Sequence, residues 1–131
     1  MKTLSILILF FAFAACKNQE NVPSETTLSG KWEWVESQGG KTGMTVKASA
    51  VNNRQLIFTH NGDFEMIENG ESKIKTSYVI REGSSITSAE KVPLIYYRSD
   101  YWQQSYHIKG DSLFLVDEVY DGYRHIYLKI R

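Results

Sequence analysis

Apolar and polar residues alternate with a period of two through most of the chain after Gly30. This period is typical of half-buried β-strands, in which successive side chains point to opposite faces. It also fixes the register, because a slip by one residue would turn each apolar set toward water. We therefore expect the following sets to face a core: Trp32 and Trp34; Leu56 and Phe58; Ile74, Thr76, Tyr78 and Ile80; Leu113 and Leu115; and Ile126, Leu128 and Ile130.

Tight-turn dipeptides separate the alternating segments, and they supply the positive φ that primed hairpin turns require. These dipeptides are Asn61-Gly62, Asn69-Gly70, Gly110-Asp111 and Asp121-Gly122. They predict successive hairpins between strands over 30–37, 54–60, 63–69, 72–81, 91–98, 103–109, 112–118 and 123–131. Pro93 cannot donate a ladder hydrogen bond, so we expect it at a strand start or at a bulge.

This strand order predicts an all-β fold, an eight-stranded antiparallel up-and-down meander barrel, because closure removes exposed sheet edges. The alternative is a small β-sandwich or an incompletely closed barrel. Residues 39–53 interrupt the pattern with Gly39, Gly40 and Gly43. A helical turn over residues 48–50 is one interpretation of this segment. A loop of this length is either a lid or a connector without a role.

The N-terminus has the features of an export signal over residues 1–15. Lys2 precedes an apolar run over residues 4–13, and Ala14 and Ala15 follow it. The run is shorter than the about 20 residues that a membrane span needs, and its length suits a signal peptide. Residues 16–28 then form a polar tether, and residues 29–131 form one folded domain.

The segment Phe13-Ala14-Ala15-Cys16 resembles a lipobox, the cleavage site of bacterial lipoproteins. The resemblance implies a diacylglyceryl thioether on Cys16 and an acyl group, such as palmitate, on its new amine. Such chains anchor a protein stably in a membrane. The expected location is the cell envelope of a Gram-negative bacterium, in the outer membrane rather than the inner one, with the domain facing the periplasm or the surface. The membrane is thus the first expected partner.

Composition argues against several functional classes. The 15 basic and 15 acidic residues balance, whereas nucleic-acid recognition usually requires a clustered basic face. Cys16 is the only cysteine, so an internal disulfide is excluded. His60, His107 and His125 lack metal-ligand spacing, and no nucleophile elbow, phosphate loop or dinucleotide fingerprint occurs. We expect no enzyme activity, catalytic residue, cofactor, metal site or nucleic-acid partner.

Tyrosine and tryptophan residues are concentrated in the second half of the chain. Strands favour Tyr, so these residues can be purely structural. Alternatively, Tyr hydroxyls orient a mostly apolar ligand in a cavity. The candidate ligand-binding residues are Tyr78, Tyr96, Tyr101, Trp102, Tyr106 and Tyr120. In a meander barrel, the connections at 39–53, 69–70, 99–102 and 118–122 would ring one mouth, which places Tyr101, Trp102 and Tyr120 beside the glycine-rich segment.

Gly30-Lys31-Trp32 resembles the Gly-x-Trp signature of lipocalins. The fuller pattern resembles the lipocalin-like domains of small bacterial lipoproteins, and it adds the segments 56–64 and 110–113 and Asp121-Gly122-Tyr123. The resemblance implies that Trp32 is a structural plug at one barrel end. It also implies that an Arg near the end of the last strand, Arg124 or Arg131, packs over Trp32.

Two functional classes follow from these patterns. In the first, the barrel binds a small lipophilic or sugar-like ligand, or a protein partner. In the second, the protein is a structural or interaction protein of the envelope, and its own side chains fill the barrel. An eight-stranded barrel has a size at which both outcomes occur. Convergence of the large side chains on one interior would favour the second class.

Overall fold

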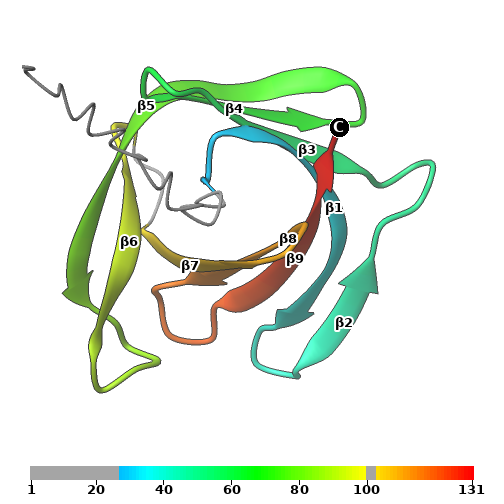
Figure 1. Cartoon of the computed structure of the whole chain (residues 1–131). Helices are drawn as coiled ribbons and strands as arrows, with labels where there is room; N and C mark the ends of the chain where they lie inside the picture. The colour runs from blue at the N-terminus through cyan, green and yellow to red at the C-terminus, as the bar shows by residue number, and fades with distance from the viewer. Residues whose placement is uncertain (1–26, 100–102) are drawn as a thin grey trace, which may run out of the picture.

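The computed structural model describes residues 27–99 and 103–131, and its strands form a ring (Figure 1). Within these residues the strands are β1 (Gly30–Gly39), β2 (Met44–Lys47), β3 (Arg54–Phe58), β4 (Asp63–Glu68), β5 (Glu71–Ser84), β6 (Lys91–Tyr97), β7 (Gln104–Lys109), β8 (Ser112–Asp117) and β9 (Tyr123–Ile130). Each pairs antiparallel with its neighbours in the order β2-β1-β3-β4-β5-β6-β7-β8-β9, and β1 also pairs with β9. The predicted eight-stranded meander barrel is therefore confirmed, with β2 as an additional strand.

The predicted loop over residues 39–53 contains the strand that the sequence did not reveal. β2 pairs with the second half of β1, from Glu36↔Lys47 to Gly39↔Met44, whereas β3 pairs with the first half. Met44 and Val46 alternate with Thr45 and Lys47, but all four residues of β2 are exposed, so this short alternation marks no buried face. The helical turn predicted over 48–50 is also wrong. Ser49 and Asn52 instead exchange backbone hydrogen bonds of 2.9 and 3.2 Å across a tight turn.

Hairpin turns lie where the dipeptides predicted them. Asn69 and Asp121 have φ angles of 50° and 57°, which few residue types other than Gly tolerate. Gly62, Gly70 and Gly110 also have positive φ. The sequence signal for these turns was strong because the local backbone conformation itself restricts the residue type.

A β-bulge in β1 changes which side chains enter the barrel. The pairing with β9 runs from Trp32↔Lys129 to Trp34↔Tyr127 and resumes at Glu36↔Ile126, so Val35 has no partner on β9. After the bulge, Ser37 is buried and Glu36 is not. An extra residue on one strand shifts the inward-facing set by one position. The bulge thus places a hydroxyl inside the barrel where simple alternation would place a carboxylate.

The apolar alternation assigns the correct face to most strands but the wrong face to β9. Leu56, Phe58, Leu113 and Leu115 are buried as expected, whereas Leu128 is 47% exposed and Tyr127 only 2%. The inward set on β9 is His125, Tyr127 and Lys129, because these residues pair with the inward-facing residues of β1. Ile80 on β5 is likewise exposed rather than buried.

Pro93 stops the pairing between β6 and β7. Backbone groups point alternately to the two sides of a strand. Because Arg98 N donates to Ser77 O of β5, the nitrogen of Pro93 points toward β7, where it has no hydrogen to donate. β6 and β7 accordingly pair only at Leu94↔Ser105 and Ile95↔Gln104. Pro93 is the third residue of β6 and not its start, and the ladder on its β7 side begins only after it.

Candidate functional site

Large aromatic side chains fill the barrel interior. Trp32, Trp34, Phe58 and Phe64 are all at most 5% exposed. Ring centroids lie 4.9 Å apart for Phe58 and Phe64, and 5.1 Å apart for Phe58 and Tyr78. These are the tilted and edge-to-face contacts typical of packed aromatic cores. The convergence of large side chains expected for a filled barrel is therefore present along the axis.

One end of the interior, which we call the Trp32 end, is apolar. Trp32 is fully buried, and its Nε1–H donates to the carbonyl oxygen of Leu28 at 2.8 Å. Lys129 Nζ lies 5.1 Å from the centroid of the Trp32 ring. The cation beside the ring is thus Lys129 and not Arg124 or Arg131. Arg131 instead pairs with Asp111 at 2.9 Å, and Arg124 faces outward.

A chain of polar side chains crosses the other end, which we call the polar end. Ser37 Oγ lies 2.6 Å from His125 Nδ1, and His125 Nε2 lies 3.1 Å from Asp117 Oδ1. The chain continues through further buried bonds of 2.7–2.8 Å: Trp34 Nε1–H to Ser37 Oγ, Gln104 Nε2–H to Asp117 Oδ1, and Tyr97 OH to Gln104 Oε1. Since the carboxylate only accepts, His125 donates from Nε2, and in the neutral ring Nδ1 is then the acceptor for the Ser37 hydroxyl hydrogen.

Ser37, His125 and Asp117 are residue types that activate a nucleophile in hydrolases. Their surroundings here favour a structural role. Ser37 is 6% exposed, and its oxygen already accepts the Trp34 Nε1–H bond. Asp117 additionally accepts from the backbone N–H of Tyr123 at 3.2 Å. A fully bonded buried network of this kind fixes the arrangement of the strands that carry it.

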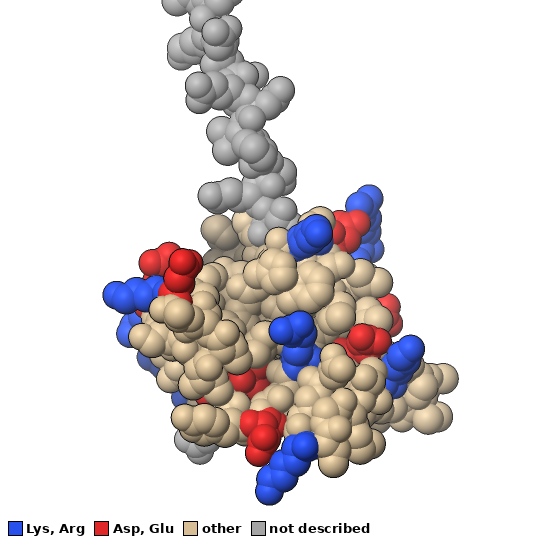
Figure 2. Space-filling view, turned by 90° about the horizontal axis from the view of Figure 1, so that it is seen from below, with Lys and Arg blue, Asp and Glu red and all other residues tan. Residues whose placement is uncertain are grey.

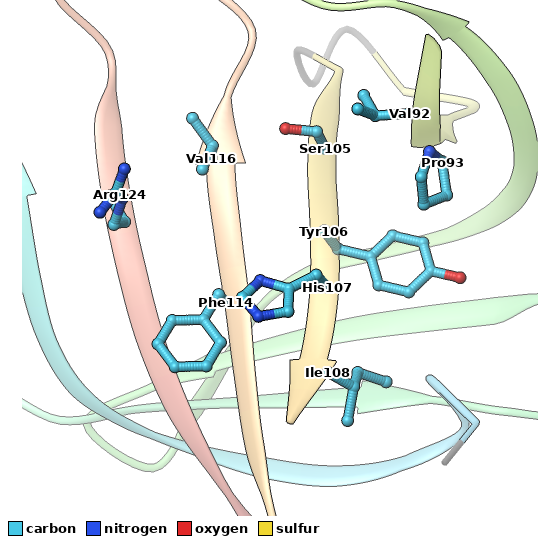
Figure 3. Close-up of a pocket in the computed structure, with 9 residues that line it drawn as sticks. All are labelled: Val92, Pro93, Ser105, Tyr106, His107, Ile108, Phe114, Val116 and Arg124. Atoms are coloured by element: carbon cyan, nitrogen blue, oxygen red, sulfur yellow. The ribbon is translucent and has the colours of Figure 1, made fainter. Parts of the chain in front are cut away.

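A groove opens on the side of the barrel where β6 and β7 separate, and we call it the β6–β7 groove. It has a volume of about 720 Å³ and is lined by Val92, Pro93, Ser105, Tyr106, His107, Ile108, Phe114, Val116 and Arg124 (Figure 3). This volume lies within the range typical of small-molecule sites. The groove follows directly from the interrupted ladder at Pro93, because a complete β6–β7 pairing would close it.

The floor of the groove is the outer face of β7, β8 and β9, and Tyr106 and Ile108, which pack against the core, line it from the inner face of β7. Cross-strand partners place Ser105, Val116 and Arg124 in one row, and His107 and Phe114 in the next. The His107 and Phe114 rings stack with centroids 4.6 Å apart and planes 10° apart. In Figure 3, the Tyr106 ring extends from β7 toward Pro93. The groove is therefore mostly apolar, with polar atoms at defined positions.

The tip of the β5–β6 hairpin is fixed against the β8–β9 connection. Glu118 Oε1 accepts a hydrogen bond from Ser85 Oγ at 2.8 Å, and Glu118 Oε2 accepts one from the backbone N–H of Ile86 at 2.8 Å. Val92 and Pro93 belong to the same hairpin. The wall of the groove is thus held by side-chain bonds rather than by the β6–β7 ladder.

Burial raises the pKa of the Tyr106 phenol, and the neighbouring Tyr78 adds to this effect. Tyr106 therefore stays neutral at physiological pH. Its hydroxyl makes no hydrogen bond to a described residue, whereas the Tyr78 hydroxyl donates to Thr59 O at 2.9 Å. A neutral phenol, whose hydroxyl makes no hydrogen bond to the residues that the structure describes, thus lines the groove.

The structure separates the tyrosines that the sequence grouped as a ligand site. Tyr106 lines the groove, and Tyr78 packs inside the barrel beside it. Tyr96 lies on the outer face, with Arg81 Cζ 6.0 Å from its ring centroid. Tyr120 is 91% exposed in the β8–β9 connection. Tyr101 and Trp102 lie outside the described residues.

Two of the connections predicted to ring one mouth, those over 39–53 and 118–122, meet at one end of the barrel. Gly40 N and Gly122 O of the β1–β2 and β8–β9 turns lie 3.5 Å apart, and Glu118 N donates to Gln103 O of the β6–β7 connection at 3.0 Å. These connections therefore share the polar end. The Ser37–His125–Asp117 chain lies beneath them inside the barrel.

Sequence reasoning missed both the polar chain and the groove. Ser37 enters the barrel only through the bulge at Val35, which no residue pattern announced. His125 was assigned to the polar, outward set of its strand. Pro93 was a usable signal for the groove, because a proline inside an alternating segment predicts an interrupted ladder.

In the part of the chain that the structure describes, no cluster of three or more His, Cys, Asp and Glu residues is arranged to hold a metal ion. No helix among these residues has the length and apolarity to cross a membrane. Comparison with protein-family models, curated proteins and solved structures finds no match for this chain.

Proposed function

We propose that this protein is a lipid-anchored binding module of the bacterial cell envelope, and that the β6–β7 groove binds a small lipophilic ligand. The observation that carries the proposal is a groove of about 720 Å³ with mostly apolar walls beside a filled barrel interior. The lipobox-like segment ending at Cys16 supports the anchor, and the Gly30-Lys31-Trp32 signature supports a lipocalin-like domain. The ligand site then lies on the side of the barrel and not on its axis.

The second candidate function is a structural or interaction protein of the envelope without a ligand. The packed interior favours it, because side chains occupy the axial space that other barrels use for ligands. In that case the groove is a surface for a protein partner. We propose no enzyme activity, since Ser37 is buried and its oxygen is already engaged by Trp34.

Substitution Cys16→Ser tests the anchor. We expect the variant to lack lipid, to leave the membrane fraction and to remain uncleaved after Ala15. Metabolic labelling with a fatty acid and fractionation of membranes measure these effects. Continued detergent-phase partitioning of a cleaved variant would contradict the proposal.

Photolabelling tests the groove in the full-length protein, purified from its membranes and held in nanodiscs. The probe is octanol carrying a diazirine, whose short chain limits partitioning into lipid. We expect labelled peptides from β7 and β8, and loss of this labelling in Val116→Glu, which places a charge in the groove. Val79→Glu is the matched control, because Val79 is 48% exposed on the outer face of β5. Equal labelling in both variants would contradict binding in the groove.

A further inference from the structure

Arg124 brings a cation to the groove that has no partner among the described residues. Arg124 is exposed on β9 and lines the groove, and its guanidinium makes no ion pair or hydrogen bond to a described residue. The other described arginines near acids are paired: Arg54 with Glu68 at 2.8 Å and Arg131 with Asp111 at 2.9 Å. An unpaired cation beside an apolar surface is suited to an anionic group of a ligand.

The arrangement around Arg124 separates its charge from the apolar part of the groove. Arg124 is the cross-strand neighbour of Val116 on β8, and Val116 is the cross-strand neighbour of Ser105 on β7. Since adjacent strands lie about 4.8 Å apart, Arg124 is about 10 Å from the β7 end of the groove. Pro93 and Ile108 lie toward that end, whereas Phe114 lies on β8, between β7 and the strand that carries Arg124 (Figure 3). The charge thus lies at the β9 end of the groove, and the apolar side chains line its part over β8, β7 and β6.

The remaining polar groups of the groove do not neutralise this cation. The Tyr106 phenol stays neutral because its pKa is raised. Ser105 and His107 supply no negative charge. On the face of the domain seen in Figure 2, basic and acidic residues are interspersed rather than separated by sign. A ligand anion would therefore be recognised by Arg124 individually and not by a general positive field.

We infer that the β6–β7 groove binds an amphipathic anion, with its acidic head on Arg124 and its apolar chain along Phe114, Ile108 and Pro93. This inference rests on the proposed function and adds the ligand class. The shared chemistry is a carboxylate or phosphate monoester on a short hydrocarbon chain. A free fatty acid and a lipid fragment are two sources of such a molecule.

Competition with the photoreactive octanol tests the inference in the same full-length protein in nanodiscs. The competitors are octanoate, octyl phosphate, octanol and octyltrimethylammonium. We expect the better of the two anions to compete about tenfold more strongly than octanol, which corresponds to about 1.4 kcal/mol. The preferred anion identifies the head group as carboxylate or phosphate.

Arg124→Gln should reduce competition by the anion to the level of octanol, while labelling by octanol itself is unchanged. Arg124→Lys should restore part of the preference, because it keeps the charge but loses the bidentate geometry. Arg81→Gln is the matched control on the outer face of β5. Equal far-UV circular dichroism and unfolding midpoints establish that the variants fold.

The outcomes distinguish the two proposals. Two outcomes would overturn the ligand class and leave the binding function standing. In the first, octanol labels the groove but anions compete no better than octanol. In the second, the preference for anions survives in Arg124→Gln. Strongest competition by octyltrimethylammonium would also overturn the ligand class. Absence of octanol labelling in the groove would overturn the binding function and the inference together.

Discussion

The two ends of the barrel interior are closed by different kinds of interaction. At the Trp32 end, a fully buried ring makes one hydrogen bond to Leu28, lies beside the Lys129 ammonium and packs against the apolar core. At the polar end, Ser37, His125 and Asp117 form a continuous chain of hydrogen bonds. Both ends exclude water. At the Trp32 end a large side chain fills the space, whereas at the polar end each buried donor is matched with an acceptor.

This difference predicts different responses to the same type of substitution. An apolar replacement at the Trp32 end loses stability in proportion to the volume removed. At the polar end, an apolar replacement of the correct size still leaves buried polar groups without partners, which is the more damaging defect per atom. The stability loss at the polar end should therefore depend on which hydrogen-bonding groups a substitution removes, and the loss at the Trp32 end on the side-chain volume it removes.

Trp32→Ala should have the largest effect, a loss of about 3–5 kcal/mol in the free energy of unfolding, because it leaves a large cavity. Trp32→Phe keeps most of the apolar volume and should cost about 1–2 kcal/mol. Urea denaturation followed by far-UV circular dichroism measures both. Equal losses in the two variants would show that the Leu28 hydrogen bond, and not volume, dominates at this end.

His125→Phe should destabilise the fold by about 3 kcal/mol, although it preserves an aromatic ring. The variant leaves the Asp117 carboxylate and the Ser37 hydroxyl without their shared partner. His107→Phe is the matched control on the outer face and should change stability by at most about 0.5 kcal/mol. Similar unfolding midpoints for the two variants would contradict a stabilising role of the polar chain.

Ser37→Ala should cost about 1–2 kcal/mol, since Trp34 Nε1 and His125 Nδ1 both lose the hydroxyl. Ser84→Ala, at an exposed position of β5, should have almost no effect. The tryptophan emission maximum of the folded Ser37→Ala variant provides a second readout, because Trp34 is its neighbour. An unchanged unfolding free energy would exclude Ser37 from the network.

Lys129→Met should have the smallest effect, about 0.5–1 kcal/mol, through loss of the cation–π contact with Trp32. Adding salt should narrow the difference between wild type and variant if charge is responsible, since salt screens exposed charges. A difference independent of salt would assign the contribution of Lys129 to its aliphatic stem.

The fold was predictable where local chemistry restricts the backbone or where one face of a strand is strongly apolar. Asn69, Gly70 and Asp121 marked turns because their positive φ angles exclude most residue types. Leu113 and Leu115 marked an inward face because both carbon side chains are fully buried. These signals depend on only a few neighbouring residues, so they can be recognised in the sequence without knowledge of the partner strand.

The candidate sites depend on register and were less predictable. Ser37 is inward only because of the bulge beside it, and β9 buries His125 and Tyr127 while exposing Leu128. The decisive factor in both cases is a cross-strand partner distant in sequence. Arg124 was considered as a cover for Trp32, but the register places it on the outer face beside Val116.

The pairing of β1 with β9 has a consequence for the order of folding. Successive hairpins form from neighbouring segments, whereas Lys31↔Ile130 joins residues at opposite ends of the described domain. Contacts of such long sequence separation are slow to form, because the chain entropy of closing the ring is lost first. The β1–β9 pairing is therefore expected to form last, and until it forms both β1 and β9 present unpaired edges to other chains.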